Sequence, residues 1–208
     1  GVPDFFDNSL TDNTRSSYPL SYIDNSVESR SSKFQPKDVV LLTCDAFSIL
    51  PAIAKLTPEE AWKFFMIGYT SKVAGTERGV DTPVATFSPC FGSPFMTRKP
   101  SVYANMLKKY LEESGANCWM LNTGWTNGPV GVGERIPLGE TREILNKIYS
   151  GELKNSKTFE HSYTGLNVPL IIDVNLTLLK PELGWGNTSD YEENCSFLLN
   201  EMVKVLQD

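Results

Sequence analysis

Blocks of hydrophobic residues separated by polar stretches predict that strands and helices alternate along this chain. Residues 39–43 and 117–121 are apolar runs with the length of buried strands. Between them, residues 57–67 predict a helix, because Thr57 and Glu60 can form a capping box at its start. Apolar residues occupy most of the circumference of this helix, and a helix of this kind is usually buried in a larger body.

Three further helices are expected downstream. Residues 101–114 predict a helix that ends at Gly115, a residue preferred at helix C-termini, and residues 141–150 predict another. The last helix is expected to run from a capping box of Ser189 and Glu192 to residue 206. The apolar face of the first of these is expected to be Tyr103, Met106, Leu107, Tyr110 and Leu111, and that of the last Tyr191, Cys195, Leu198, Leu199, Met202 and Leu206.

This alternation of strands and helices indicates an α/β fold class, with a mixed α+β arrangement as the alternative. Residues 159–188 are expected to be irregular, with short strands around 168–174. Neither an internal repeat nor a linker divides the sequence, so we expect a single domain over residues 1–208. The chain begins with Gly1 and not with Met, which predicts a piece of a longer protein.

Charge and cysteine content exclude several classes of partner. A net charge of −6, from 25 acidic and 19 basic residues, argues against nucleic acid. No apolar run approaches the roughly 18 to 20 residues that span a bilayer, so we expect no membrane partner. The spacings of Cys44, Cys90, Cys118 and Cys195 match no zinc pattern, and His161 is the single histidine, so we expect no metal site within the chain. Four reduced thiols fit a cytoplasmic protein.

Four stretches are richer in Gly, Arg and Thr than packing requires, namely residues 11–15, 74–79, 87–95 and 122–141. Glycine-rich loops allow a backbone to approach a ligand closely, and arginine binds oxyanions, so an anionic ligand such as a phosphate would suit them. However, neither a Walker-type motif nor a strict G-x-G-x-x-G occurs.

On the residues alone, blander readings of these stretches stay open. Arg15 and Arg135 also fit surface or ion-paired arginines. Phe95 and Trp125 also fit aromatics that pack against their own loops.

In chain order, however, the motifs form a recognisable series. It consists of T-D-N-T-R at 11–15, L-L-T-C-D-A-F at 41–47, G-T-E-R-G at 75–79, F-S-P-C-F-G-S-P-F at 87–95, N-T-G-W at 122–125 and G-V-G followed by Arg135 and Ile136. The series resembles the C-terminal part of ATP-dependent phosphoenolpyruvate carboxykinase, from about residue 8 to residue 206. Several long motifs in the correct order are far more specific than any one of them.

This resemblance implies a carboxy-lyase activity of gluconeogenesis, in which oxaloacetate and ATP give phosphoenolpyruvate, carbon dioxide and ADP. It implies that the chain is the C-terminal portion of a mononucleotide-binding domain. The phosphate-binding loop, the N-terminal domain and the ligands of Mn²⁺ and Mg²⁺ would then lie upstream in the same polypeptide. A phosphoryl-transfer site without these parts loses most of its rate enhancement, so we expect the 208-residue chain alone to be inactive.

The resemblance also implies roles for individual residues. Arg15 would be catalytic, because it would stabilise charge on the transferring phosphoryl group. Arg135 and Ile136 would border the adenine, Thr141 would contact the nucleotide, and Phe95 would lie near the active site. A lid loop over the nucleotide would be formed by Gly75, Thr76, Glu77, Arg78 and Gly79, and would exclude water from the reaction.

The chain departs from the family pattern in two relevant places. Glu134 stands where the family usually has a lysine, which reverses a charge beside the nucleotide. The family segment L-D-P-R-N-x-W appears here as L-K-P-E-L-G-W at 179–185. A second hypothesis is therefore a non-catalytic nucleotide-binding or interaction module that retains only the adenine side. A third, a structural domain without a ligand, fits poorly with the apolar helix at 57–67, which expects a partner surface.

Overall fold

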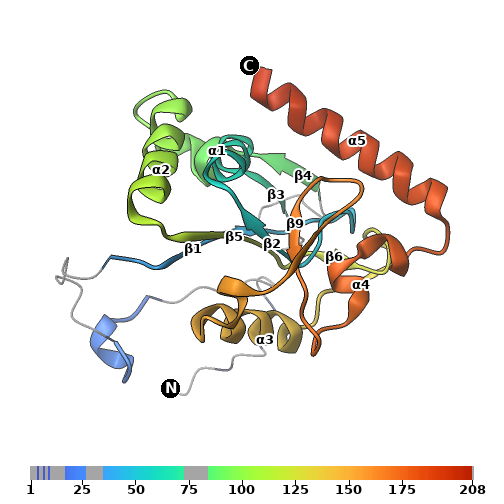
Figure 1. Ribbon diagram of the computed structural model, residues 1–208, viewed down its shortest axis with the longest axis horizontal. Helices are drawn as coiled ribbons and strands as arrows, with labels where there is room; N and C mark the ends of the chain where they lie inside the picture. Colours follow the sequence, from blue (N-terminus) through green and yellow to red (C-terminus); the bar gives the residue numbers. More distant parts are fainter. Residues whose placement is uncertain are drawn as a thin grey trace.

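A mixed β-sheet lies at the centre of the computed structural model, which describes residues 4, 7, 9, 17–26, 35–72 and 84–207 (Figure 1). In the described part of the chain the sheet has five strands in the order β1-β5-β2-β9-β8. Their bounds are β1 Asp38–Thr43, β2 Ile53–Leu56, β5 Asn117–Asn122, β8 Thr158–Glu160 and β9 Asn167–Pro169. β1 and β5 run parallel, and the other neighbours run antiparallel.

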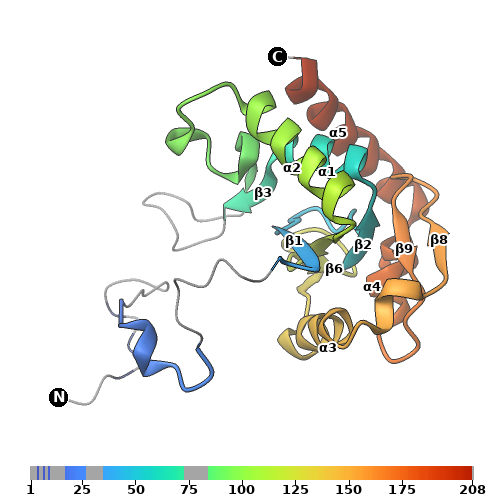
Figure 2. The same cartoon turned by 60° about the vertical axis from the view of Figure 1, so that its left-hand side comes forward.

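Helices cover both faces of this sheet (Figures 1 and 2). α1 (Pro58–Ile67), α2 (Pro100–Ser114) and α5 (Thr188–Gln207) contribute to one hydrophobic core. α3 (Leu138–Tyr149) and α4 (Leu176–Leu179) contribute to a second core on the opposite face. The predicted α/β fold class is therefore confirmed, with helical layers on either side of a mixed sheet.

The alternation of side chains along β5 separates these two cores. Cys118 and Met120 belong to the core under α1, α2 and α5, whereas Trp119 and Leu121 belong to the core above α3 and α4. All four side chains are at most 2% exposed. Because β5 lies between β1 and β2 and is covered on both faces, it needs a continuous apolar sequence, which is why the strand could be predicted.

The ends of α1 and α2 agree with the sequence signals. The Glu60 backbone N–H donates to Thr57 Oγ1 over 3.2 Å, and the Thr57 N–H donates to Glu60 Oε2 over 2.7 Å, so the predicted capping box is confirmed. α2 ends at Gly115, which has a φ of +66°. Its expected apolar face is wrong at Met106, which is 64% exposed because Ala104 occupies the buried position.

The starts of α3 and α5 differ from the expected ones. α3 begins at Leu138, three residues before the predicted start. α5 begins at Thr188, so the predicted capping box at Ser189 is wrong. The Asn187 side chain takes that role, since its Oδ1 accepts the Ser189 N–H over 3.0 Å. The apolar stripe of α5 is confirmed at its buried positions Tyr191, Cys195, Leu198 and Met202.

Short elements complete the described structure. The strands predicted around 168–174 are limited to β9, which pairs with β8 as a hairpin and ends at Pro169. Two further antiparallel ribbons are formed by β3 (Tyr69–Lys72) with β4 (Val84–Phe87) and by β6 (Trp125–Thr126) with β7 (Glu134–Arg135). The 3-10 helices are η1 Leu20–Tyr22, η2 Pro89–Phe91, η3 Ser93–Phe95, η4 Glu152–Asn155 and η5 Pro181–Gly184.

All four cysteines are buried and carry free thiols. Burial raises the pKa of each of them, to about 12 for Cys118 and to about 11 for Cys195. Within the described ranges, no helix is both long enough and apolar enough to cross a membrane.

Candidate active site

Asp45 organises the turn that follows β1. The residue is completely buried. Its Oδ1 accepts hydrogen bonds from the Phe47 N–H over 2.9 Å and from the Tyr69 hydroxyl over 2.7 Å. Its Oδ2 accepts the N–H groups of Ile49 over 2.7 Å and Leu50 over 2.8 Å. Burial raises the pKa of Asp45, and these hydrogen bonds act in the opposite direction. One carboxyl group therefore holds residues 45–50, which we call the Asp45 turn.

The Asp45 backbone joins this turn to the end of the neighbouring strand β5. The Asp45 N–H donates to Asn122 Oδ1 over 3.0 Å, and the Trp125 N–H donates to the Asp45 carbonyl over 2.8 Å. A Cβ atom on Gly124 would lie 2.1 Å from the Asp45 carbonyl oxygen, so this close approach requires glycine. The carboxyl ends of the two parallel strands are thus fixed relative to each other, at the edge where α/β folds usually bind their ligands.

An arginine and a tryptophan face each other at this edge. Trp125 and Arg135 are opposite residues of the β6–β7 ribbon, and the guanidinium carbon lies 5.6 Å from the indole centroid. Arg135 Nε donates to the Thr123 carbonyl over 3.1 Å, and its Nη2 lies 4.0 Å from Cys44 Sγ. We call these two residues the Trp125–Arg135 pair. The pair presents a fixed, planar, positively charged surface at the protein exterior, where a guanidinium can also donate to an anion.

The glycine-rich loop between β6 and β7 rests on the Asp45 turn. The Gly128 N–H donates to Ser48 Oγ over 3.3 Å, and the Val130 N–H donates to the Ala46 carbonyl over 2.9 Å. A Cβ atom on Gly133 would lie 2.2 Å from the Gly128 carbonyl oxygen. The loop is therefore packed closely, and Gly133 is needed for this close contact.

Ile136 and Thr141 continue from Arg135 into α3. The Ile136 N–H donates to the Gly124 carbonyl over 2.8 Å, and the Ile136 side chain is 6% exposed in the second core. Thr141 lies in the first turn of α3 and is 7% exposed. Of these three predicted site residues, the structure places Arg135 against Trp125, whereas Ile136 and Thr141 follow it in the chain and are buried.

The other predicted site residues are placed differently. Phe95 lies in η3, between β4 and α2, and its side chain is 83% exposed. Among the described residues, no hydrogen bond or ring contact links it to Arg135. Arg15 and the lid residues Gly75, Thr76, Glu77, Arg78 and Gly79 lie outside the described residues.

Glu134 stands beside the pair with the opposite charge. Its side chain is exposed, and Asn127 Nδ2 donates to its Oε1 over 3.4 Å. The negative charge expected from the sequence is thus located on the same two-residue strand as Arg135.

Sequence reasoning assigned no role to Asp45 or Asn122, although each is at or just beyond the end of a predicted strand. A carboxylate directly after one buried strand and an amide at the end of its neighbour were the signal that could have identified them. As for metals, the described ranges contain no group of three or more His, Cys, Asp or Glu residues that could hold an ion.

The fold and this site define an α/β protein with a candidate ligand edge at the carboxyl ends of a parallel strand pair. The phosphoenolpyruvate carboxykinase family model matches residues 1–175. Proteins named phosphoenolpyruvate carboxykinase (ATP) are similar to this chain over nearly its whole length. Those of Agrobacterium fabrum (strain C58 / ATCC 33970) and Methylorubrum extorquens (strain PA1) are 47% identical over 203 residues and 48% identical over 200 residues. The one of Mesorhizobium japonicum (strain LMG 29417 / CECT 9101 / MAFF 303099) is 44% identical over 200 residues.

These matches cover 95 to 97% of this chain and 37 to 38% of each relative. The chain therefore belongs to the ATP-dependent phosphoenolpyruvate carboxykinase family, and it spans somewhat more than a third of the length of these curated relatives.

Proposed function

We propose that this chain supplies the adenine side, the lid and the C-terminal helices of the active site of an ATP-dependent phosphoenolpyruvate carboxykinase. The observation that supports this most directly is the Trp125–Arg135 pair, a planar cation held at the ligand edge of the sheet in a chain of this family. In this proposal Arg135 and Ile136 border the adenine, Thr141 contacts the nucleotide and Phe95 lies near the active site.

The proposed reaction converts oxaloacetate and ATP into phosphoenolpyruvate, carbon dioxide and ADP. Loss of carbon dioxide leaves an enolate, whose oxygen takes the γ-phosphoryl group as ADP departs. Such a transfer depends mainly on positioning and on neutralising charge. Arg15 would stabilise the transferring phosphoryl oxygens, and the loop of residues 75–79 would close over the nucleotide and exclude water.

We propose that the rest of the same polypeptide supplies the phosphate-binding loop, the ligands of Mn²⁺ and Mg²⁺ and most contacts to oxaloacetate. The resemblance supports this, and so does the greater length of the relatives. Residues 1–208 would then be the C-terminal portion of one nucleotide-binding domain. The acidic net charge of −6 supports a protein without nucleic-acid partners, and its four free thiols support a cytoplasmic location without a membrane partner.

The direct test is an assay of the full-length protein with oxaloacetate, ATP and Mn²⁺. We expect phosphoenolpyruvate and ADP to form in equal amounts, and we expect the 208-residue chain alone to give neither. Arg15→Ala should abolish turnover, whereas the matched variant Arg98→Ala should keep it, because Arg98 is an exposed arginine outside the proposed site.

Absence of ATP-dependent decarboxylation in the full-length protein would overturn the proposal. If the full-length protein lacked this activity but bound ATP tightly and without metal, the hypothesis of a non-catalytic nucleotide-binding module would take the place of this proposal.

A further inference from the structure

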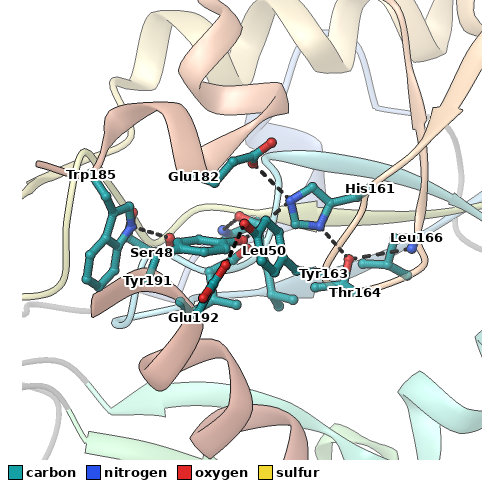
Figure 3. Close-up of polar contacts among 12 residues, drawn as sticks. Ser48, Leu50, His161, Tyr163, Thr164, Leu166, Glu182, Trp185, Tyr191 and Glu192 are labelled. Carbon is teal, nitrogen blue, oxygen red and sulfur yellow. Dashed lines mark hydrogen bonds and ion pairs between the residues drawn. The ribbon is translucent and has the colours of Figure 1, made fainter. Parts of the chain in front are cut away.

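A buried polar cluster lies against the Asp45 turn and is hydrogen-bonded to its Ser48 and Ile49 carbonyls (Figure 3). At its centre is His161, which is 1% exposed. His161 Nδ1 lies 2.7 Å from Thr164 Oγ1, and Nε2 lies 3.1 Å from Glu182 Oε2 and 3.4 Å from the Tyr191 hydroxyl. These partners come from the β8–β9 hairpin, from η5 and from α5, so one imidazole joins its own hairpin to η5 and to α5.

The partners define which atoms of this cluster donate. The Tyr191 hydroxyl donates to the Ile49 carbonyl over 3.0 Å, so its oxygen accepts from His161. The Glu182 carboxylate also accepts, and both partners therefore require a proton on Nε2. Thr164 then donates to the bare Nδ1. Burial lowers the pKa of His161, which favours this same neutral form.

Two hydrogen bonds connect the cluster to the Asp45 turn. Besides the bond from Tyr191 to the Ile49 carbonyl, Trp185 Nε1 donates to the Ser48 carbonyl over 3.1 Å. The Trp185 and Tyr191 rings meet edge to face at 5.6 Å, as Figure 3 shows. Successive carbonyl groups of the turn are thus held by two aromatic side chains that support each other.

The backbone held in this way is strained at Ser48. Ser48 has a φ of +58°, in the left-handed region that side chains other than glycine rarely adopt. The same residue accepts the Gly128 N–H at its Oγ, and the next N–H groups, from Ile49 and Leu50, bind the Asp45 carboxylate. A shift of Ser48 would therefore move both the glycine-rich loop and Asp45.

We propose that His161, Glu182 and Tyr191 are positioning residues for the nucleotide side of the active site. Glu182 sets the His161 tautomer, His161 orients the Tyr191 hydroxyl, and Tyr191 holds the Ile49 carbonyl of the Asp45 turn. The Asp45 turn then supports the Trp125–Arg135 pair, because the Asp45 carbonyl accepts the Trp125 N–H. This inference rests on the proposed function, because its effect is on the use of ATP.

The test uses the full-length protein and compares KM for ATP with KM for oxaloacetate. Tyr191→Phe keeps the ring but removes the donor to Ile49, so KM for ATP should rise about five- to tenfold, a change within the range found for residues that act on a site without touching its ligand. KM for oxaloacetate should change less than about twofold, because the turn supports only the nucleotide side. Tyr163→Phe is the matched control, since it also removes a tyrosine hydroxyl near His161, one that donates to the exposed Glu192 and not to the turn. It should leave both KM values unchanged.

A second series separates positioning from stability. Glu182→Ala removes the nearer of the two acceptors of His161 Nε2 and should raise KM for ATP, whereas Glu182→Gln should restore it, because an amide oxygen can still accept that hydrogen bond. Ile148→Val, a change in the second core, provides a variant that lowers the unfolding temperature without touching the cluster.

The inference is overturned if Tyr191→Phe lowers the unfolding temperature as Ile148→Val does but leaves KM for ATP unchanged. It is also overturned if both KM values rise together. Failure of the proposed function has a different signature: the unchanged protein then shows no ATP-dependent decarboxylation, and both proposals are withdrawn.

Discussion

At the scale of single residues, Arg135 combines charge with a fixed orientation. Its guanidinium lies over Trp125 and donates to the Thr123 carbonyl. Arg135→Lys keeps the charge but loses the planar contact and the Nε donor, so the proposed site should bind ATP about five- to tenfold more weakly. Titration calorimetry with the full-length protein measures this. Arg98→Lys, at an exposed arginine outside the pair, should bind as tightly as the unchanged protein, and equal affinities for both variants would argue against an ATP site at Arg135.

His161 gives the protein a defined dependence of stability on pH. Burial lowers the pKa of His161 below its ordinary value of 6.5, an effect that the Glu182 carboxylate opposes only in part. The unfolded chain therefore takes up a proton on this side chain at a higher pH than the folded chain does. The contribution of neutral His161 to stability is complete above about pH 6.5 and is lost as the pH falls through the lower folded-state pKa.

Because the chain has a single histidine, one imidazole signal in NMR spectra reports this titration directly. We expect its midpoint below that of the unfolded chain. Urea unfolding at falling pH should show a steeper loss of stability for the unchanged protein than for His161→Gln, and identical pH profiles would contradict the prediction.

These residues also show what could be predicted from sequence at this scale. Arg135 and Ile136 were predicted as site residues because they follow a glycine-rich motif of a known family. The structure places Arg135 against Trp125, and the roles of both residues remain predictions. The position of Asp45 just after a predicted strand was a signal, but its partners were beyond sequence reasoning. Its carboxylate binds the N–H groups of its own turn and the hydroxyl of Tyr69, 24 residues away, and those contacts exist only after folding.

At the scale of elements, the β6–β7 ribbon depends on Gly133, and Gly139 in α3 provides a control position. A Cβ atom on Gly133 would meet the carbonyl oxygens of Gly128 and Thr126 at 2.2 and 2.3 Å. Gly133→Ala should therefore displace the ribbon and lower the free energy of unfolding by about 2 kcal/mol. Gly139 has no atom within 4 Å of its Cβ position. Gly139→Ala should instead raise the free energy of unfolding by about 0.5 kcal/mol, because alanine restricts the unfolded chain.

Chemical denaturation of both variants measures the two changes with one method. The prediction fails if the two substitutions shift the unfolding midpoint in the same direction.

Glu134 provides a test of charge on the same ribbon. Its carboxylate is exposed on the same two-residue strand as Arg135, and under the proposed function it should repel the triphosphate of ATP. Glu134→Lys should lower KM for ATP about two- to threefold at low ionic strength, and salt should weaken this gain because the Debye length falls to about 3 Å near 1 M. Glu193→Lys makes the same charge change on the exposed surface of α5 and should have no effect. A gain that persists at high salt would point to a direct contact and not to the charge itself.

Elements with strong local signals were predictable, and short ones were not. α1 and α2 carry recognisable ends, and β1 and β5 are long enough to form apolar runs. β6 and β7 contain two residues each, which is too few to show a periodic pattern in the sequence. Their pairing depends on the glycine-rich loop that packs on the Asp45 turn.

At the scale of the whole molecule, the order of strands in the sheet was beyond sequence reasoning. β2 lies antiparallel between β5 and β9, although 60 residues of the chain separate Leu56 from Asn117. Such long-range pairings are decided by how apolar faces fit together in both cores, and not by any local pattern. The class of the fold could be predicted because it depends only on which kinds of elements alternate.

The four buried cysteines can report how often each part of the protein opens. Cys44 lies beyond β1, Cys90 in η2, Cys118 in β5 and Cys195 in α5, and none is more than 9% exposed. With raised pKa values and little access to solvent, each thiol should react with a disulfide reagent mainly when its own part of the protein opens.

Mass spectrometry of the labelled peptides should therefore rank the regions of the native protein by how often they open, with Cys118 reacting last because β5 is covered on both faces. If the Trp125–Arg135 pair is where ATP binds, ATP should slow the labelling of Cys44 beneath Arg135 far more than that of Cys195. Equal protection of both would place the nucleotide elsewhere. The same thiols, whose spacing in the sequence matches no zinc pattern, can thus locate a bound ligand without any substitution.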